Sequence, residues 1–245
     1  MNAPSSAGGA GLSETSAETA EAKRRIPAWL EIPLLIVLAF ALAMFLKTFV
    51  VQVFYIPSGS MENTLMVGDR VAVNRFIYRF GEPSRGDVVV FDGVGAFVFP
   101  TEPVEDPNPL EWLVTELGRT VGVTPPPDTV FVKRVIGVAG DRVACCDTEG
   151  RITVNGVPID ESQYLYPGDS ASTVAFDVLV PEGTLWVMGD HRSASADSRA
   201  HLGDPGGGFV PVDQVLGKVF VIIWPPSRWQ GVPDGEAAQL AFAAP

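Results

Sequence analysis

Two serines in a short turn are the first candidates for chemistry in this sequence. The turn reads Ile56-Pro-Ser-Gly-Ser-Met-Glu-Asn-Thr-Leu65, so a single glycine separates Ser58 from Ser60. A hydroxyl fixed on such a turn could attack an electrophilic carbon, but serine is a weak nucleophile until a neighbouring base takes its proton. Because Ser-Gly-Ser also occurs in ordinary turns, the interpretation depends on finding a base elsewhere in the chain.

Histidine is the usual base for a serine, and the chain has two histidines, His191 and His201. In a Ser-His-Asp triad the acid orients the imidazole. Asp190 directly precedes His191, and neighbouring residues of an extended chain point to opposite faces. This arrangement excludes neither histidine, but it does not favour a triad.

Lys133 is the stronger candidate for the base. It lies in Phe131-Val-Lys-Arg-Val-Ile-Gly-Val-Ala-Gly140, a stretch in which each face of a strand would have one cation among apolar residues. We expect such a strand to be largely buried, and burial lowers the pKa of a lysine because it disfavours the charged form. Arginine keeps its proton at accessible pH, so Lys133 rather than Arg134 can become a neutral base. The alternative is a lysine at a sheet edge with its amine in solvent.

A third polar segment, Gly189-Asp-His-Arg-Ser-Ala-Ser-Ala-Asp-Ser-Arg199, follows the apolar run Leu185–Met188. Its serines, acids and arginines suit a fixed hydrogen-bond network, in which Asp197 pairs with Arg199 and a serine hydroxyl orients a lysine amine. The same pattern could also be a solvated turn.

Together these segments resemble the bacterial type I signal peptidases, the membrane-bound Ser/Lys endopeptidases that remove signal peptides from exported preproteins. The family's sequence boxes occur here in order, and the resemblance covers roughly residues 30–225. The boxes are Ser58-Gly-Ser-Met61 with Thr64-Leu65, Arg85-Gly-Asp-Val-Val-Val-Phe91, Lys133-Arg-Val-Ile-Gly-Val-Ala-Gly-Asp141, and Gly189-Asp190 with Arg192, Ser195 and Asp197-Ser-Arg199.

The resemblance implies a role for each matching residue. Ser60 would be the nucleophile and Lys133 the general base. The Ser58 hydroxyl would join the backbone N–H of Ser60 in stabilising the oxyanion, and Ser195 would orient the lysine amine. Asp197 and Arg199 would form a structural ion pair.

The resemblance also implies a substrate and a fold. Substrates would be preprotein signal peptides with small residues at the first and third positions before the cut, which require shallow apolar pockets. Candidates for the pocket walls are Ile56, Met61, Val132 and Ala139. The catalytic domain would be largely β, and the region between Asp141 and Leu185 would form a small accessory lobe.

Two positions depart from the family's pattern. Asn63 stands where a proline usually precedes Thr-Leu, and His191 stands where an asparagine usually follows Gly-Asp. We expect both to alter a turn or a neighbouring contact without removing the chemistry.

The elements that must position these residues begin with an apolar run near the N-terminus. Lys23-Arg-Arg25 precedes Ile26–Leu46, in which Glu31 is the one charge. Residues 26–48 are therefore expected to form a single transmembrane helix, because about 20 apolar residues span a bilayer. The basic flank places the N-terminus, with a disordered tail over residues 1–25, in the cytoplasm and the catalytic domain outside the cell membrane. A cleavable signal peptide is the alternative, but no small-x-small site follows the run.

The rest of the chain is predicted to be mostly β, with residues 49–228 as the catalytic domain. Asn155-Gly156 is typical of a two-residue hairpin turn, and it lies in the expected accessory lobe, residues 141–185. Residues 93–128 are expected to form an extended surface loop, solvated or in contact with lipid or substrate, and residues 229–245 a flexible tail. The predicted strands are Arg70–Asn74, Asp87–Phe91, Thr129–Val138, Arg151–Val154, Ala175–Val180, Leu185–Met188 and Gly217–Trp224.

The net charge and the cysteine content limit which partners and cofactors the chain is expected to bind. A formal net charge of −12 argues against nucleic acid, which requires a basic face, and leaves signal peptides and membrane lipid as the expected partners. The adjacent Cys145 and Cys146 could form a vicinal disulfide or stay reduced. A metal site is not expected, because both histidines are distant in sequence from the cysteines and four spaced ligands are lacking; no other cofactor is expected either.

Three functions fit these features. The leading one is a membrane-anchored serine endopeptidase that cleaves signal peptides with a Ser/Lys dyad. A Ser/Lys self-cleaving protease would share the chemistry, but the chain has an apolar anchor and lacks a DNA-binding segment. An inactive anchored protein that only binds signal peptides would need neither the serine nor the lysine.

Overall fold

The computed structural model describes residues 31–40, 51–99, 108 and 128–233. The chain separates into two compact units, Met1–Ala41 and Leu42–Pro245. In the first unit, residues 31–40 form a helix with exposed side chains. No helix within the described ranges is both long and apolar enough to cross a membrane. Residues 26–30 and 41–48 of the expected transmembrane helix lie outside those ranges, as does the expected tail, residues 1–25.

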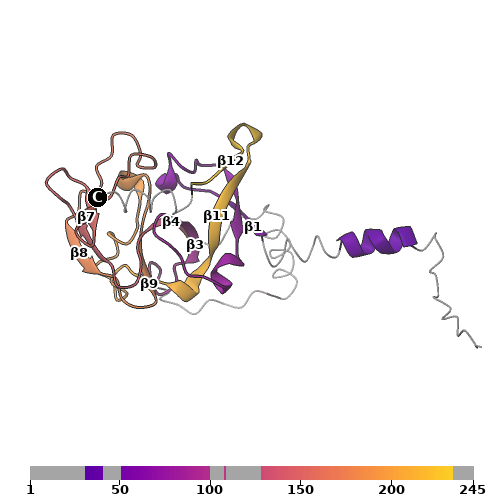
Figure 1. Cartoon of the computed structure of the whole chain (residues 1–245), viewed down its shortest axis with the longest axis horizontal. Helices are drawn as coiled ribbons and strands as arrows, with labels where there is room; N and C mark the ends of the chain where they lie inside the picture. The colour runs from indigo at the N-terminus through magenta and orange to yellow at the C-terminus, as the bar shows by residue number, and fades with distance from the viewer. Residues whose placement is uncertain (1–30, 41–50, 100–107, 109–127, 234–245) are drawn as a thin grey trace, which may run out of the picture. The chain divides into compact units, whose positions relative to one another are not determined.

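The second unit is built from two β-sheets (Figure 1), so the expectation of a mostly β fold is confirmed. The larger sheet has eight strands in the order β1-β2-β11-β3-β4-β9-β10, with β12 beside β11. Its strands are β1 (Val51–Tyr55), β2 (Arg70–Asn74), β3 (Val88–Asp92), β4 (Val130–Gly137), β9 (Thr184–Met188), β10 (Val210–Pro211), β11 (Val215–Trp224) and β12 (Gln230–Gly231).

The smaller sheet lies within residues 141–185. Its strands are β5 (Arg142–Cys145), β6 (Ile152–Val154), β7 (Val157–Pro158) and β8 (Phe176–Leu179), in the order β7-β6-β5-β8. Asn155 and Gly156 both have positive φ angles, 54° and 80°, as the type I′ turn predicted between β6 and β7 requires. At the end of β5, Cys145 and Cys146 are joined by a vicinal disulfide.

Two expectations for the edges of the domain are wrong. Residues 93–98 are not part of an extended surface loop. They form a tight turn in which the Gly93 carbonyl accepts three backbone N–H groups, and Phe97 is buried against Phe91. The flexible tail begins later than residue 229, because β12 pairs with β11 and Val232 packs in the core. Most of the expected loop, residues 100–107 and 109–127, and the tail from residue 234 lie outside the described ranges.

The core of the larger sheet also holds the serine turn. Ile56, Met61 and Leu65 are almost fully buried in one cluster with Val71 and Val88 from the neighbouring strands. Burying an apolar side chain of this size contributes about 1.5–3 kcal/mol. The apolar residues of the turn therefore fasten it to the sheet, which fixes the backbone that carries Ser60.

Candidate active site

The turn that carries Ser60 is closed by backbone hydrogen bonds at both ends. The N–H of Gly68 donates to the carbonyl of Ile56 at 2.9 Å, and the N–H of Ile56 donates to Asp69 at the same distance. Between them lies the single-turn helix η1 (Gly59–Met61), whose first carbonyl accepts the N–H of Glu62 at 3.0 Å. Ser60 is therefore held in an ordered turn and is only 8% exposed.

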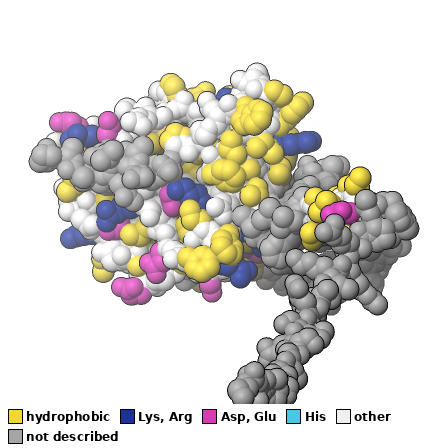
Figure 2. All heavy atoms as spheres, turned by 45° about the vertical axis from the view of Figure 1, so that its right-hand side comes forward, with side chains coloured by type: hydrophobic (Ala, Val, Ile, Leu, Met, Phe, Trp, Pro, Cys, Tyr) yellow, Lys and Arg dark blue, Asp and Glu magenta, His cyan; other side chains and the backbone are white. Residues whose placement is uncertain are grey.

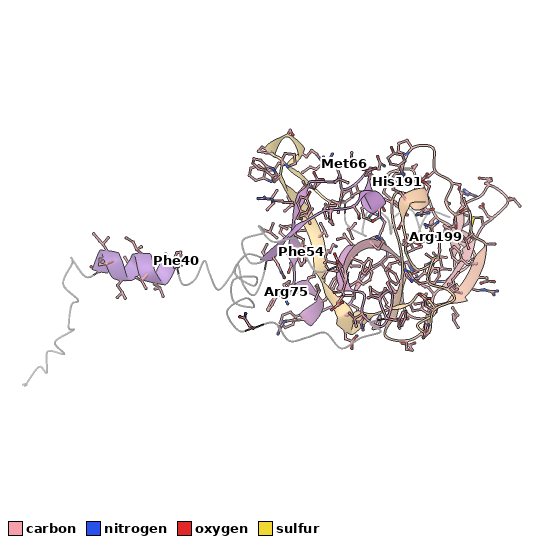
Figure 3. The ribbon with its side chains drawn as sticks, turned by 180° about the vertical axis from the view of Figure 1, so that it is seen from behind. Phe40, Phe54, Met66, Arg75, His191 and Arg199 are labelled. Carbon is pink, nitrogen blue, oxygen red and sulfur yellow. A yellow bond between two sulfur atoms is a disulfide. The ribbon has the colours of Figure 1, made fainter. Side chains whose placement is uncertain are left out.

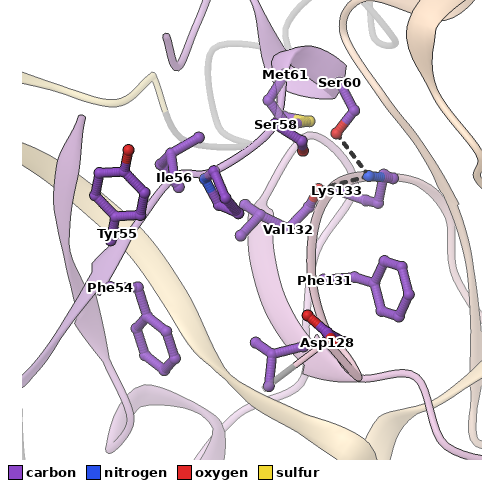
Figure 4. A pocket seen from close by; sticks show the side chains of 12 residues that line it. Phe54, Tyr55, Ile56, Ser58, Ser60, Met61, Asp128, Phe131, Val132 and Lys133 are labelled. Atoms are coloured by element: carbon purple, nitrogen blue, oxygen red, sulfur yellow. Dashed lines mark hydrogen bonds between the residues drawn. The ribbon is translucent and has the colours of Figure 1, made fainter. Parts of the chain in front are cut away.

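Lys133 meets Ser60 from β4, a strand in the interior of the larger sheet. Its amine donates to Ser60 Oγ at 2.8 Å and to the carbonyl of Val132 at 3.1 Å (Figure 4). The side chain is 4% exposed. The structure thus brings together two residues that are 73 positions apart in the sequence.

The environment of Lys133 changes its protonation. Burial lowers the pKa of the amine from its ordinary value to about 8, and the negative charges of Asp197 and Asp190 limit the fall. A lysine with such a pKa is neutral in part of the molecules near pH 7. Once neutral, its nitrogen can accept the proton of the Ser60 hydroxyl, which lies within hydrogen-bond distance.

The segment 189–199 packs directly against the serine turn. The N–H of His191 donates to the Ser60 carbonyl at 3.1 Å. Gly189 lies so close that a Cβ at this position would be 2.5 Å from the same oxygen, a separation that real Cβ atoms do not adopt. The glycine is needed here for close approach of the two backbones.

Asp197 and Arg199 form an ion pair inside this segment, with Nη2 and Oδ2 2.8 Å apart. Asp197 also accepts the N–H of Gly189 at 2.9 Å. Burial would raise the pKa of Asp197, but the hydrogen bonds and the charge of Arg199 hold it below the ordinary value. The carboxylate therefore stays charged and fixes the loop beside Ser60.

Ser195 does not make the contact expected from the resemblance. Its Oγ is buried and is not bonded to the Lys133 amine, which donates to Ser60 and Val132. The Ser195 hydroxyl instead lies over Gly189, where a Cβ would come within 2.3 Å of it.

A cavity of about 200 Å³ opens beside the two residues, and most of its wall is apolar. Ser58 lies on its wall; its hydroxyl does not cap η1, which leaves it available to a ligand. The lining residues are Phe54, Tyr55, Ile56, Pro57, Ser58, Ser60, Met61, Asp128, Val130, Phe131, Val132 and Lys133 (Figure 4).

Three of the four residues proposed for the pocket line this cavity, and Ala139 does not. Ala139 is not part of the cavity wall because β4 ends at Gly137 and Ala139 lies beyond it. At about 3.3 Å per residue, Ala139 lies more than 15 Å along the chain from Lys133. It is exposed in the turn that leads to the smaller sheet.

The sequence did not predict a second buried network behind the serine turn. Arg134 donates to Asp190 with Nε–Oδ1 and Nη2–Oδ2 distances of 2.8 and 2.7 Å, and to the carbonyl of Gly86 at 2.8 Å. Thr64 of the serine turn donates to the same carboxylate. These side chains all lie in the family's sequence boxes, but the sequence does not indicate which of them pair with one another.

A serine hydroxyl held against a buried amine, beside an apolar cavity, is the arrangement that a serine hydrolase with lysine in place of histidine would need. The sequence model of the family described as signal peptidase, peptidase S26, matches residues 29–224. The chain therefore belongs to the signal peptidase family, and it is a serine endopeptidase of the kind that cleaves signal peptides from preproteins.

Individual relatives agree with this assignment. A probable signal peptidase I of Mycobacterium leprae is 41% identical over 258 residues, which cover 93% of this chain and 88% of the relative. Signal peptidase I of Mycobacterium tuberculosis is 41% identical over 219 residues, 81% of this chain and 74% of the relative. Probable signal peptidase I-2 of Synechocystis is 34% identical over 216 residues, 86% of this chain and 81% of the relative.

Proposed function

We propose that this protein cleaves signal peptides at the outer surface of the cell membrane, with Ser60 as the nucleophile and Lys133 as the general base. The observation that carries the proposal is the 2.8 Å contact between Lys133 Nζ and Ser60 Oγ in a buried site. A neutral amine in this position has the geometry and the pKa that a base for serine needs.

The reaction begins when Ser60 Oγ attacks the scissile carbonyl carbon and its proton passes to the Lys133 amine. The tetrahedral intermediate collapses when Lys133 returns that proton to the leaving nitrogen, which frees the amino terminus of the mature protein. The signal peptide stays as an ester on Ser60. Lys133 then takes a proton from water, and the resulting hydroxide hydrolyses the ester and restores both residues.

Negative charge develops on the carbonyl oxygen during both steps, and Ser58 is the proposed side-chain donor to it, together with the backbone N–H of Ser60. The Ser58 hydroxyl is not used as a helix cap and lies on the cavity wall. Donors that are fixed before the reaction stabilise an oxyanion without reorganisation, and one such donor is worth about 10²–10³ in rate.

The cavity supports the choice of small side chains before the cut. Ile56, Met61 and Val132 contribute branched or flexible apolar side chains to a wall that encloses about 200 Å³. We propose that these three residues contact the small residues at the first and third positions before the cut. Larger side chains would displace the buried turn that carries Ser60.

We propose that residues 26–48 form a transmembrane helix with the N-terminus in the cytoplasm. The support is the length of the apolar run and its basic flank. The first described strand, β1, begins at Val51 and pairs there with Asn74. Exposed Phe76, Ile77 and Phe80 follow Asn74 in the sequence, so exposed apolar side chains follow directly the residue that pairs with the start of β1.

Lipid contact is proposed for a second exposed apolar group, at the opposite end of the same strands. It consists of Met66 and Val67, which directly follow the serine turn, with Trp224 and Trp229 of the β11–β12 hairpin. Hydrophobic side chains gather in a patch on the face shown in Figure 2. Tryptophan is typical of the membrane–water interface, and such contact would keep Ser60 near an inserted signal peptide.

The experiment uses the full chain in lipid vesicles and a preprotein with alanine at both specificity positions. Ser60→Ala and Lys133→Ala should each abolish cleavage. Ser193→Ala should not, because Ser193 is an exposed serine of the segment 189–199. Wild-type turnover by either of the first two variants would overturn the assignment of the dyad. Binding of the preprotein without cleavage by the unaltered chain would favour a binding protein instead.

A further inference from the structure

The two residues at which this chain departs from the usual family pattern meet at one place in the structure. Asn63 Nδ2 donates to the carbonyl of Leu165 at 3.1 Å. The imidazole of His191, labelled in Figure 3, stacks on the ring of Tyr166 with centroids 3.8 Å apart and 13° between the planes. Both departures therefore contact Leu165–Tyr166, in the connection between β7 and β8 of the smaller sheet.

His191 also holds the serine turn itself. Its backbone N–H donates to the Ser60 carbonyl, as described above, and its Nδ1 lies 3.3 Å from the Gly59 carbonyl and 3.2 Å from Glu62 Oε2. An N–H at Nδ1 can donate to either oxygen. One side chain thus bridges η1 and the Tyr166 ring.

Asn63 depends on a backbone conformation that proline cannot adopt. Its φ is +88°, in the left-handed region where asparagine is among the few tolerated non-glycine residues. Proline is locked near −65°, so the usual family residue would not fit this turn. The left-handed conformation places the Asn63 amide within hydrogen-bond distance of Leu165.

The segment on the far side of these contacts is itself fixed. The N–H of Tyr166 donates to the Asp190 carbonyl at 2.9 Å, and the N–H of Leu165 donates to Glu161 at 2.8 Å. Glu161 forms a buried ion pair with Arg192. Leu165–Tyr166 therefore offers a firm support rather than a loose loop.

We propose that Asn63 and His191 are positioning residues that tie the serine turn to Leu165–Tyr166, so that the placement of Ser60 Oγ against Lys133 depends on the lobe of the smaller sheet. The inference rests on the proposed function of Ser60. Lys133 is held by its strand, so the distance between the two groups is set by the turn. Small displacements of a reacting group cost large factors in rate.

The test compares matched variants of the full chain in lipid vesicles, with kcat and KM measured for preprotein cleavage. Asn63→Gly keeps the left-handed backbone, which glycine adopts freely, and removes the amide. His191→Ala removes both the stacking and the Nδ1 contacts. Each should lower kcat about tenfold and leave KM within about twofold, because the turn is displaced while the cavity remains.

His201 provides the control. Its ring also stacks on an aromatic ring, that of Phe97, and its Nδ1 lies 2.6 Å from the Asp204 carboxylate, but neither contact touches the serine turn. His201→Ala should leave kcat within about twofold of the unaltered chain. In the Asn63→Gly, His191→Ala double variant, the fold-decrease in kcat should be smaller than the product of the two single fold-decreases, because both residues hold the same turn.

Unchanged kcat in both single variants, or an equal loss in His201→Ala, would overturn the inference. If His191→Ala does not fold, His191→Phe keeps a ring on Tyr166 without Nδ1, and kcat equal to that of the unaltered chain would count against the proposal. Ser60→Ala separates the two claims. If the Ser60→Ala chain still cleaves the preprotein, the proposed function is wrong. If the Ser60→Ala chain is inactive while the Asn63→Gly and His191→Ala chains are fully active, only this inference is wrong.

Discussion

Lys133 and Arg134 are adjacent buried cations on β4, and of the two only Arg134 forms an ion pair with a described residue, Asp190. The lysine amine is instead bonded to a hydroxyl and a carbonyl. The strand alternates its side chains between two environments, so one cation is kept charged by a carboxylate while the other is left able to lose its proton. This division leaves Lys133, and not Arg134, able to act as the proposed base.

The first prediction concerns pH. Because only the neutral amine accepts a proton and the pKa of Lys133 lies at about 8, kcat/KM for preprotein cleavage should rise with pH and level off above that value. Below it, the rate should fall about tenfold per pH unit. Lys133→Arg, which keeps its proton, should be inactive throughout. A flat profile between pH 6 and 9 would show that another group is the base.

The second prediction tests the contact between Gly189 and the serine turn. Gly189→Ala places a methyl group 2.5 Å from the Ser60 carbonyl, so the turn must move and kcat should fall at least tenfold. Gly203→Ala is the matched control, because nothing lies within 4 Å of its Cβ position. Equal activity of the two variants would mean that the turn tolerates displacement.

The third prediction concerns stability. Asp190→Asn removes the charge that compensates Arg134, a side chain 2% exposed, and should lower the free energy of unfolding by about 3–5 kcal/mol. Asp177→Asn, at the exposed Arg142–Asp177 pair, should have no measurable effect, because surface pairs contribute little. Denaturant or thermal unfolding of both variants gives the comparison, and similar losses would contradict the importance of burial.

Much of the fold, and the two residues proposed as the dyad, could be picked out from the sequence because their signals are local. Arg70–Asn74 is a β-branched run and is β2 as predicted, and Asn155-Gly156 forms the expected turn because only certain residues adopt its φ angles. Ser60 and Lys133 stand in distinctive boxes. In each case the residues themselves, rather than their distant neighbours, determine the outcome.

The errors arise where the structure depends on distant parts of the chain. Gln230–Gly231 has no strand pattern of its own and becomes β12 because it pairs with Val221 and Ile222 of β11, beyond the residues of β11 that pair with β3. Phe97 is buried because its ring packs edge-to-face against the rings of Phe91 and Phe131. The Arg134–Asp190 pair joins residues 56 positions apart, and the position of Ala139 depends on where β4 ends. None of these relationships has a local signature.

The most direct test of the dyad is to find where the signal peptide becomes attached. Full chain and preprotein are mixed, quenched in acid within milliseconds, digested and analysed by mass spectrometry. The account predicts that the mass of the signal peptide appears as an ester on the fragment containing Ser60, and that Ser60→Ala shows neither ester nor cleavage. An ester on another residue, or cleavage by the Ser60→Ala chain, would contradict it.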